Sequence, residues 1–147
     1  MKHKFFLSLK PEEVFKIILN KNIETSDKEI DLYENNIDDH NLGILLSKNF
    51  NNLIILNLAD NIIENIELSK NNKDIFTKLK FMNLENNKLK DLSVDVLKAL
   101  SNLEYLFLAN NNFNNFESFK KINLSNLNYL SLAHNNITDF SSLSQEI

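Results

Sequence analysis

A repeated pattern of apolar residues is the feature that most constrains this chain of 147 residues. From Leu53 onward, apolar residues stand at the first, fourth, sixth and eleventh positions, and Asn61 stands at the ninth. The pattern begins again at Leu79, Leu103 and Leu127, so successive copies start 26, 24 and 24 residues apart. A period of this length is typical of a solenoid, in which each copy forms one coil and buries its apolar face against its neighbours.

A degenerate copy precedes these four. It starts at Asp27, where an apolar residue is expected, and carries His40 at the apolar position that follows the motif. Its remaining positions fit the pattern: Ile30, Leu32, Asn35 and Ile37. We therefore expect five coils over residues 27–147, with starts near 27, 53, 79, 103 and 127, forming a single domain after an N-terminal segment at 1–26.

Alternation of apolar and polar residues inside each copy predicts a short strand with one buried face. Strands of successive copies are expected to form a parallel sheet, and the rest of each copy returns along the outer face in short α or 3₁₀ pieces. The clearest of these is 93–100, with Ser93 as its N-cap. Residues 67–78 and 117–122 are each expected to hold a helical turn, and the pair Asp38–Asp39 a polar turn.

The Asn at the ninth position is predicted to turn the chain inward and to form a ladder through the solenoid. Its side-chain amide is expected to bond the backbone of its own turn and of the next repeat. An unpaired buried amide costs about 1–3 kcal/mol, so each member should find partners. The predicted buried ladder consists of Asn35, Asn61, Asn87, Asn111 and Asn135.

The terminal coils need covers, because a single repeat cannot bury its own apolar face. Pro11 suits a first helical position, and an apolar stripe follows it at Val14, Phe15, Ile18 and Leu19. We expect a capping helix at about 11–20, with a helix lying on a membrane surface as the alternative. No polar capping helix follows the last copy. Either the chain is part of a longer one, or its open end packs on a partner or on a second copy.

The third, fifth and seventh positions of each copy should face outward from the concave side of the sheet. Four aromatic residues gather there, and interface cores are enriched in such side chains. A partly basic partner is plausible, because acidic residues lie toward the N-terminal end of this face. The alternatives are that a terminal segment covers the aromatics or that they only stack on one another. The predicted partner-binding residues are Phe81, Tyr105, Phe107, Tyr129, Ile55, Asn83, Glu85 and Asp31.

Composition excludes several kinds of chemistry. The chain has no Cys, which rules out thiolate metal sites and disulfides. It has a single Gly, which is too few for a Gly-rich phosphate-binding loop. The three His residues are scattered, so we expect no metal, no cofactor and no catalysis. All 16 basic residues are Lys, which argues against sequence-specific nucleic-acid binding. No apolar run approaches a membrane span or a signal peptide. We expect an intracellular protein, in the cytoplasm, with the nucleus as the other option.

The last copy, L-x-x-L-x-L-x-x-N-x-I-x-x-F-x-x-L at 127–143, resembles the leucine-rich repeat superfamily, and residues 27–147 share the framework. The motif is most similar to the SDS22-like subclass, although the spacing between copies is longer than is usual there. The resemblance implies an α/β solenoid with a curved parallel sheet on its concave face. It also implies a non-catalytic adaptor or regulatory scaffold that binds another protein. A structural subunit of a large assembly, such as a ribonucleoprotein or cytoskeletal complex, is the alternative.

Overall fold

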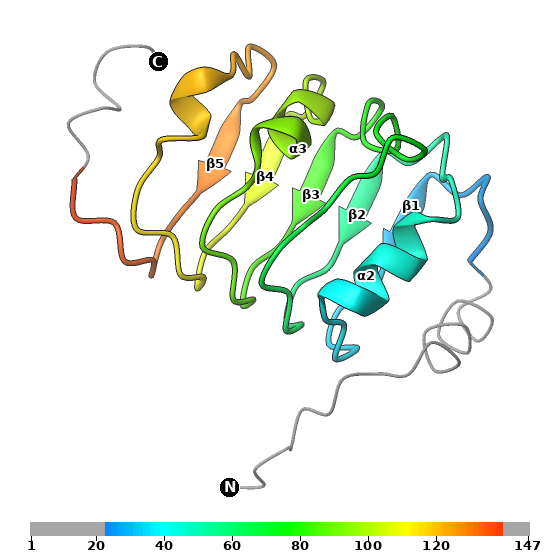
Figure 1. Cartoon of the computed structure of the whole chain (residues 1–147), viewed down its shortest axis with the longest axis horizontal. Helices are drawn as coiled ribbons and strands as arrows, with labels where there is room; N and C mark the ends of the chain where they lie inside the picture. Colours follow the sequence, from blue (N-terminus) through cyan, green and yellow to red (C-terminus); the bar gives the residue numbers. More distant parts are fainter. Residues whose placement is uncertain (1–22, 140–147) are drawn as a thin grey trace, which may run out of the picture.

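Five short parallel strands lie side by side in the computed structural model, which describes residues 23–139 (Figure 1). Their order in the sheet follows their order in the chain: β1 (Glu29–Asp31), β2 (Ile55–Asn57), β3 (Phe81–Asn83), β4 (Tyr105–Phe107) and β5 (Tyr129–Ser131). The capping helix predicted at 11–20 lies outside the described residues, as does the chain from Phe140 onward. The division of the chain at residue 26 therefore stays a prediction.

The register of the sheet follows the sequence pattern from copy to copy. Ile30 pairs with Leu56, and Leu56 pairs with Met82, across copies that start 26 residues apart. Met82 then pairs with Leu106, and Leu106 with Leu130, across the shorter spacing. The additional residues of the longer coils therefore lie outside the sheet. Because equivalent residues stand next to one another in every strand, each motif position forms a continuous row across the solenoid.

Short helices cover the convex side (Figure 1). Helix α3 (Val94–Ala99) begins after Ser93, whose hydroxyl accepts a hydrogen bond from Val96 N at 3.2 Å, as predicted. The 3₁₀-helix η1 (Phe119–Lys121) lies within the predicted turn at 117–122, whereas residues 67–78 form turns without a helix. The polar turn predicted at Asp38–Asp39 is wrong: Asp38 is the N-cap of helix α2 (Asp39–Leu46).

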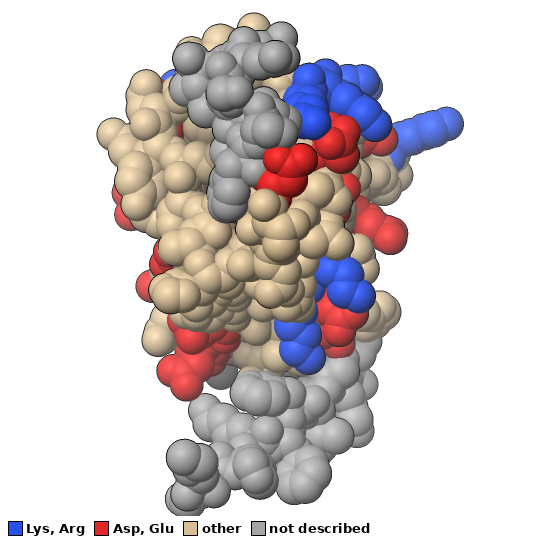
Figure 2. Space-filling view, turned by 90° about the vertical axis from the view of Figure 1, so that its left-hand side faces the viewer, with Lys and Arg blue, Asp and Glu red and all other residues tan. Residues whose placement is uncertain are grey.

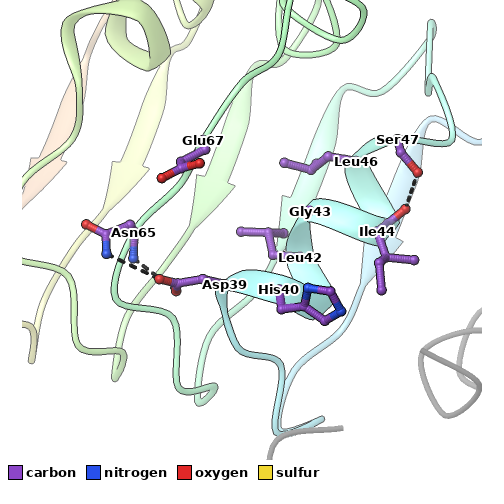
Figure 3. A pocket seen from close by; sticks show the side chains of 9 residues that line it. All are labelled: Asp39, His40, Leu42, Gly43, Ile44, Leu46, Ser47, Asn65 and Glu67. Atoms are coloured by element: carbon purple, nitrogen blue, oxygen red, sulfur yellow. Dashed lines mark hydrogen bonds between the residues drawn. The ribbon is translucent and has the colours of Figure 1, made fainter. Parts of the chain in front are cut away.

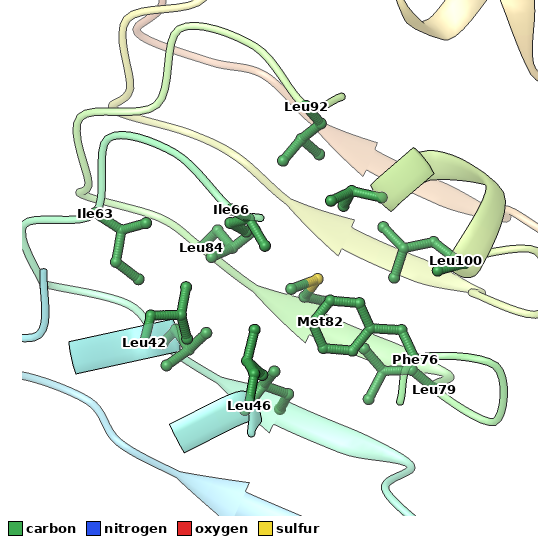
Figure 4. Packing of buried hydrophobic residues seen from close by; sticks show 14 of the residues in the cluster. Leu42, Leu46, Ile63, Ile66, Phe76, Leu79, Met82, Leu84, Leu92 and Leu100 are labelled. Carbon is green, nitrogen blue, oxygen red and sulfur yellow. The ribbon is translucent and has the colours of Figure 1, made fainter. Parts of the chain in front are cut away.

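The core lies between the sheet and the convex segments. Side chains at the fourth and sixth motif positions point into it from the strands, and Phe76 packs beside Leu79 and Met82 (Figure 4). Phe76, Leu84 and Leu100 are 0% exposed. Full burial of such side chains stabilises a fold by about 1.5–3 kcal/mol each, so the interior rows hold the coils together.

The last coil is covered less than the coils before it. Its framework side chains are half-buried: Leu124, Leu127, Leu130, Leu132 and Ile137. Their counterparts one coil earlier are at most 1% exposed: Leu100, Leu103, Leu106, Leu108 and Phe113. Within residues 23–139, no helix has the length and apolar character needed to cross a membrane.

Candidate protein-binding surface

Four aromatic side chains form one continuous cluster on the concave face. Phe81 comes from β3, Tyr105 and Phe107 from β4, and Tyr129 from β5. The ring centroids of Phe107 lie 5.1 Å from Phe81 and 5.0 Å from Tyr129, and that of Tyr105 lies 6.4 Å from Phe81. Aromatic pairs attract at such separations, and the tilted ring planes suit their quadrupoles. The strand register brings the four rings together, because alternate residues of neighbouring strands share one face. We call these four residues the aromatic cluster.

The two tyrosines of the aromatic cluster remain open to solvent. Tyr105 is 43% exposed and Tyr129 is 47% exposed, whereas Phe81 and Phe107 are half-buried. The rings contact one another in tilted pairs, but these contacts leave much of both tyrosines uncovered. Tyr33, at the seventh position of the first copy, is 49% exposed. Sequence reasoning placed Tyr33 on this face but did not include it among the candidate binding residues.

Two of the predicted polar contact residues bond the chain itself. Asp31 Oδ1 accepts from Tyr33 N at 3.1 Å and from Asn57 Nδ2 at 3.0 Å. Asn83 Oδ1 accepts from Glu85 N at 3.0 Å. Short polar side chains often bond the backbone two residues ahead, and here they close the turns that follow β1 and β3. Phe107 occupies the same row in β4, so that strand presents an aromatic ring in place of the turn-forming oxygen.

The surroundings of the aromatic cluster differ along the sheet. Ile55 and Glu85 are half-buried on its N-terminal side, and Ile55 stands beside Phe81 in the register. Lys80 Nζ and a Glu104 carboxylate oxygen form an ion pair at 2.8 Å in the row that precedes the strands. Ala109 is only 6% exposed, whereas Ala133, at the same position one coil later, is exposed.

The ninth-position asparagines form the ladder, but its hydrogen bonds run to the preceding coil. The amide nitrogen of Asn61 donates to Leu32 O at 2.9 Å, and its oxygen accepts from Ile37 N at 2.9 Å. Asn87 repeats this geometry one coil later, with Leu58 O at 2.9 Å and Ile63 N at 3.0 Å. Each amide also donates within its own turn, as expected. The prediction of bonds to the next repeat was wrong.

Burial of the ladder is complete only in its middle. Asn61, Asn87 and Asn111 are buried, with 5–8% of their surface exposed. Asn135 makes the same contacts, to Leu108 O at 2.8 Å and from Phe113 N at 3.0 Å, but is half-buried. Asn35 is also half-buried, and its amide donates to Tyr33 O at 2.7 Å. Asn35 belongs to the first of the five coils and Asn135 to the last.

A pocket of about 540 Å³ lies on the other side of the sheet, beside α2 (Figure 3). Two of its polar lining residues, Asp39 and Asn65, make structural contacts. Asp39 Oδ1 accepts from Glu64 N at 2.7 Å and Asn65 N at 3.0 Å, and Asp39 Oδ2 accepts from Asn65 Nδ2 at 3.2 Å. Asp39 thereby fixes the return segment of the second coil against α2. His40 is exposed at the margin. Residues 23–139 contain no group of three His, Asp or Glu side chains placed to hold a metal ion.

Comparisons with known proteins agree with this geometry. Residues 77–137 match the Leucine rich repeat family. A chain in the crystal structure of the Drosophila melanogaster SNF/U2A′ complex shares the fold, with a TM-score of 0.58 and 23% sequence identity, over 89% of this chain and 71% of that one. Comparison with curated protein sequences gives no significant match.

The fold is thus a leucine-rich repeat solenoid with its parallel sheet on the concave face. The family match covers residues 77–137, and the solved structure shares the fold over most of the chain. The SDS22-like subclass stays a prediction, because neither comparison separates the subclasses.

Proposed function

We propose that this protein binds another protein on its concave face and acts as a non-catalytic adaptor or regulatory scaffold. The exposed part of the aromatic cluster carries the proposal. Residues that dominate binding energies are enriched in Tyr and Trp, and their truncation often costs about 2 kcal/mol or more. Tyr105 and Tyr129 stand on a backbone fixed by strand pairing on β4 and β5. Little conformational entropy would therefore be lost when a partner covers them.

The partner we infer is a polypeptide with apolar side chains beside basic ones. Its apolar part would cover the aromatic cluster, and its basic part would face the acidic N-terminal strands, where Glu29 and Asp31 are exposed. Aromatic rings also stack on nucleic-acid bases, but these carboxylates would repel phosphate groups. The structural neighbour with this fold was solved in a complex named for two components, which supports an assembly role. We also propose that the protein acts inside the cell.

The test removes the two exposed rings and keeps the Phe81–Phe107 contact. Affinity for a captured partner should fall tenfold or more in Tyr105→Ala/Tyr129→Ala, and a tenfold fall corresponds to about 1.4 kcal/mol of binding free energy. Tyr33→Ala is the matched control, because Tyr33 is an equally exposed tyrosine outside the cluster. The melting temperature of all variants should stay within a few degrees of the wild type.

Capture would be measured by placing a photo-crosslinking phenylalanine analogue at position 105 or 33 and identifying the crosslinked protein by mass spectrometry. A single protein should crosslink to position 105, and this crosslink should be lost when Tyr129 is replaced. An unchanged affinity of the double variant for the partner so identified would refute binding at the aromatic cluster. A large fall in melting temperature would instead show that the two tyrosines serve the fold.

A structural subunit of a large assembly is the second candidate. It is favoured by the half-buried Leu side chains of the last coil, which resemble surfaces that are covered in permanent contacts. Salt-resistant co-sedimentation with ribosomes or filaments would support this role. A single crosslinked partner, together with a small particle in gel filtration, would support the adaptor.

A further inference from the structure

The two edges of the sheet differ in charge. The residues around β1 include Lys28, Glu29 and Asp31, so its edge is flanked by charged side chains. The last coil contains no Asp, Glu, Lys or Arg from Ile122 through Thr138. Natural proteins protect exposed edge strands with charged side chains, above all Lys, or with Pro or a bulge. The sequence around β5 contains neither a charged residue nor Pro.

The β5 edge also exposes backbone groups that the interior coils pair. Leu108 N donates to Ser131 O at 2.8 Å, and Asn110 N donates to Ala133 O at 2.9 Å. The equivalent N–H groups one coil later belong to Leu132 and His134. Among residues 23–139, these two N–H groups have no hydrogen-bond partner. The edge therefore offers donors at the spacing that a further strand would use.

Apolar side chains continue this edge into the open end of the core. Leu127, Leu130 and Leu132 are half-buried, although their counterparts one coil earlier are at most 1% exposed. In the end-on view, uncharged side chains occupy the left and centre of the part that is not grey, and acidic and basic side chains lie mainly to its right (Figure 2). An apolar centre within a polar rim is the usual anatomy of a protein interface.

We propose that this end binds a second copy of the chain across a two-fold axis, with β5 pairing antiparallel to β5 of the other copy. A two-fold contact brings a surface against itself, so any charge near the axis meets an identical charge. The uncharged stretch 122–138 avoids that repulsion. Its Asn and Ser side chains both donate and accept hydrogen bonds, so they can pair with their own copies.

The pairing would join the two sheets into one. Tyr129 lies on β5 itself, so the aromatic clusters of the two copies would stand on either side of the axis. The dimer would then present two concave binding surfaces side by side. This inference does not depend on what those surfaces bind.

The experiment adds charge to the last coil at positions where earlier coils already carry it. Asn128 shares its row with Lys80, and Thr138 shares its row with Lys90, so Asn128→Lys/Thr138→Lys should fold. The control is Ile54→Lys/Asn114→Lys, which adds the same two charges in the same two rows of interior coils. Sedimentation velocity of the full chain would be recorded from about 1 to 200 µM, together with circular dichroism.

The wild type and the control should pass from one to two copies of the 17.1 kDa chain as concentration rises. The charged variant should remain a single copy with an unchanged circular dichroism spectrum. As a second readout, exchange of the Leu132 and His134 amide protons, followed by NMR, should slow in the dimer and stay fast in the charged variant.

Three results would overturn the proposal. One is a wild type that stays monomeric at every concentration, which includes the case where residues 140–147 or another occupant cover the end. Another is the same association state in the charged variant and the control. The third is growth beyond two copies, which would indicate head-to-tail contacts and not a two-fold axis.

Discussion

Removal of Asn87 from the middle of the ladder should be one of the most destabilising single changes in the chain. Asn87 is only 8% exposed, and its amide nitrogen lies 2.9 Å from Leu58 O and 3.1 Å from Leu84 O. Each of these carbonyls keeps another donor after Asn87→Ala, because Asn61 also donates to Leu58 O and Asn111 also donates to Leu84 O. The third acceptor, Glu85 O, keeps the Asp60 N–H at 2.9 Å.

The N–H of Ile63 has no such replacement. It donates to Asn87 Oδ1 at 3.0 Å, and Ile63 is 0% exposed. A buried donor left without a partner costs about 1–3 kcal/mol, and loss of the two amide N–H donors costs about 1 kcal/mol each. Asn87→Ala should therefore lower the free energy of unfolding by about 3–5 kcal/mol, a large share of the roughly 5–15 kcal/mol typical of a domain.

Asn135→Ala is the matched comparison, because it removes the same contacts where water can replace them. Asn135 is half-buried, so its loss should cost only about 1–2 kcal/mol. Both would be measured by urea unfolding, followed by circular dichroism and by tyrosine fluorescence. The two signals must coincide, since solenoids can unfold one part at a time. A cost below about 1 kcal/mol for Asn87→Ala, or equal costs for the two variants, would refute the argument from the orphaned Ile63 N–H.

Three further substitutions test local features by the same urea unfolding. Gly43→Ala should stabilise the protein by about 0.5–1 kcal/mol, because Gly43 lies within α2 and a Cβ added there meets nothing within 4 Å; a loss of stability would contradict this. Ser93→Ala should cost about 1 kcal/mol by removing the hydroxyl that caps α3, and no change would mean that water replaces it. Asn110, at φ 55°, adopts a left-handed backbone, so Asn110→Val should cost at least about 1–2 kcal/mol, whereas Asn110→Gly should change stability little. Equal effects of Val and Gly would show that the backbone angle is not the cause.

The strands were predictable because the same apolar positions recur in successive copies of the repeat, so each strand position is indicated several times. Helix α2 was missed because it belongs to the degenerate first copy, in which Asp27 and His40 depart from the pattern. A signal was present nonetheless: Leu42, Leu45 and Leu46 follow Asp38 at helical spacing, and Asp38 is a good N-cap.

The candidate surface was predictable in position but not in detail. Strand alternation alone places Tyr105 and Tyr129 on the concave face. It does not show that Asp31 and Asn83 bond the backbone two residues ahead, because that depends on how the turn after each strand closes. The direction of the ladder was also hidden. It depends on which neighbouring coil presents its N–H groups to the amide, and motif spacing carries no information on that point.

The direction of the ladder has a consequence for synthesis on the ribosome. The coils are synthesised in order from β1 to β5. A buried N–H of each coil gains its hydrogen-bond acceptor only when the asparagine of the following coil has been made. The N–H of Ile37 donates to Asn61, 24 residues later, and the N–H of Phe113 donates to Asn135, 22 residues later. At about 5–20 residues per second, this interval lasts about 1–5 s. Each coil therefore completes its buried hydrogen bonds only after the following coil has emerged, so the newest coil outside the ribosome is the one that is still incomplete.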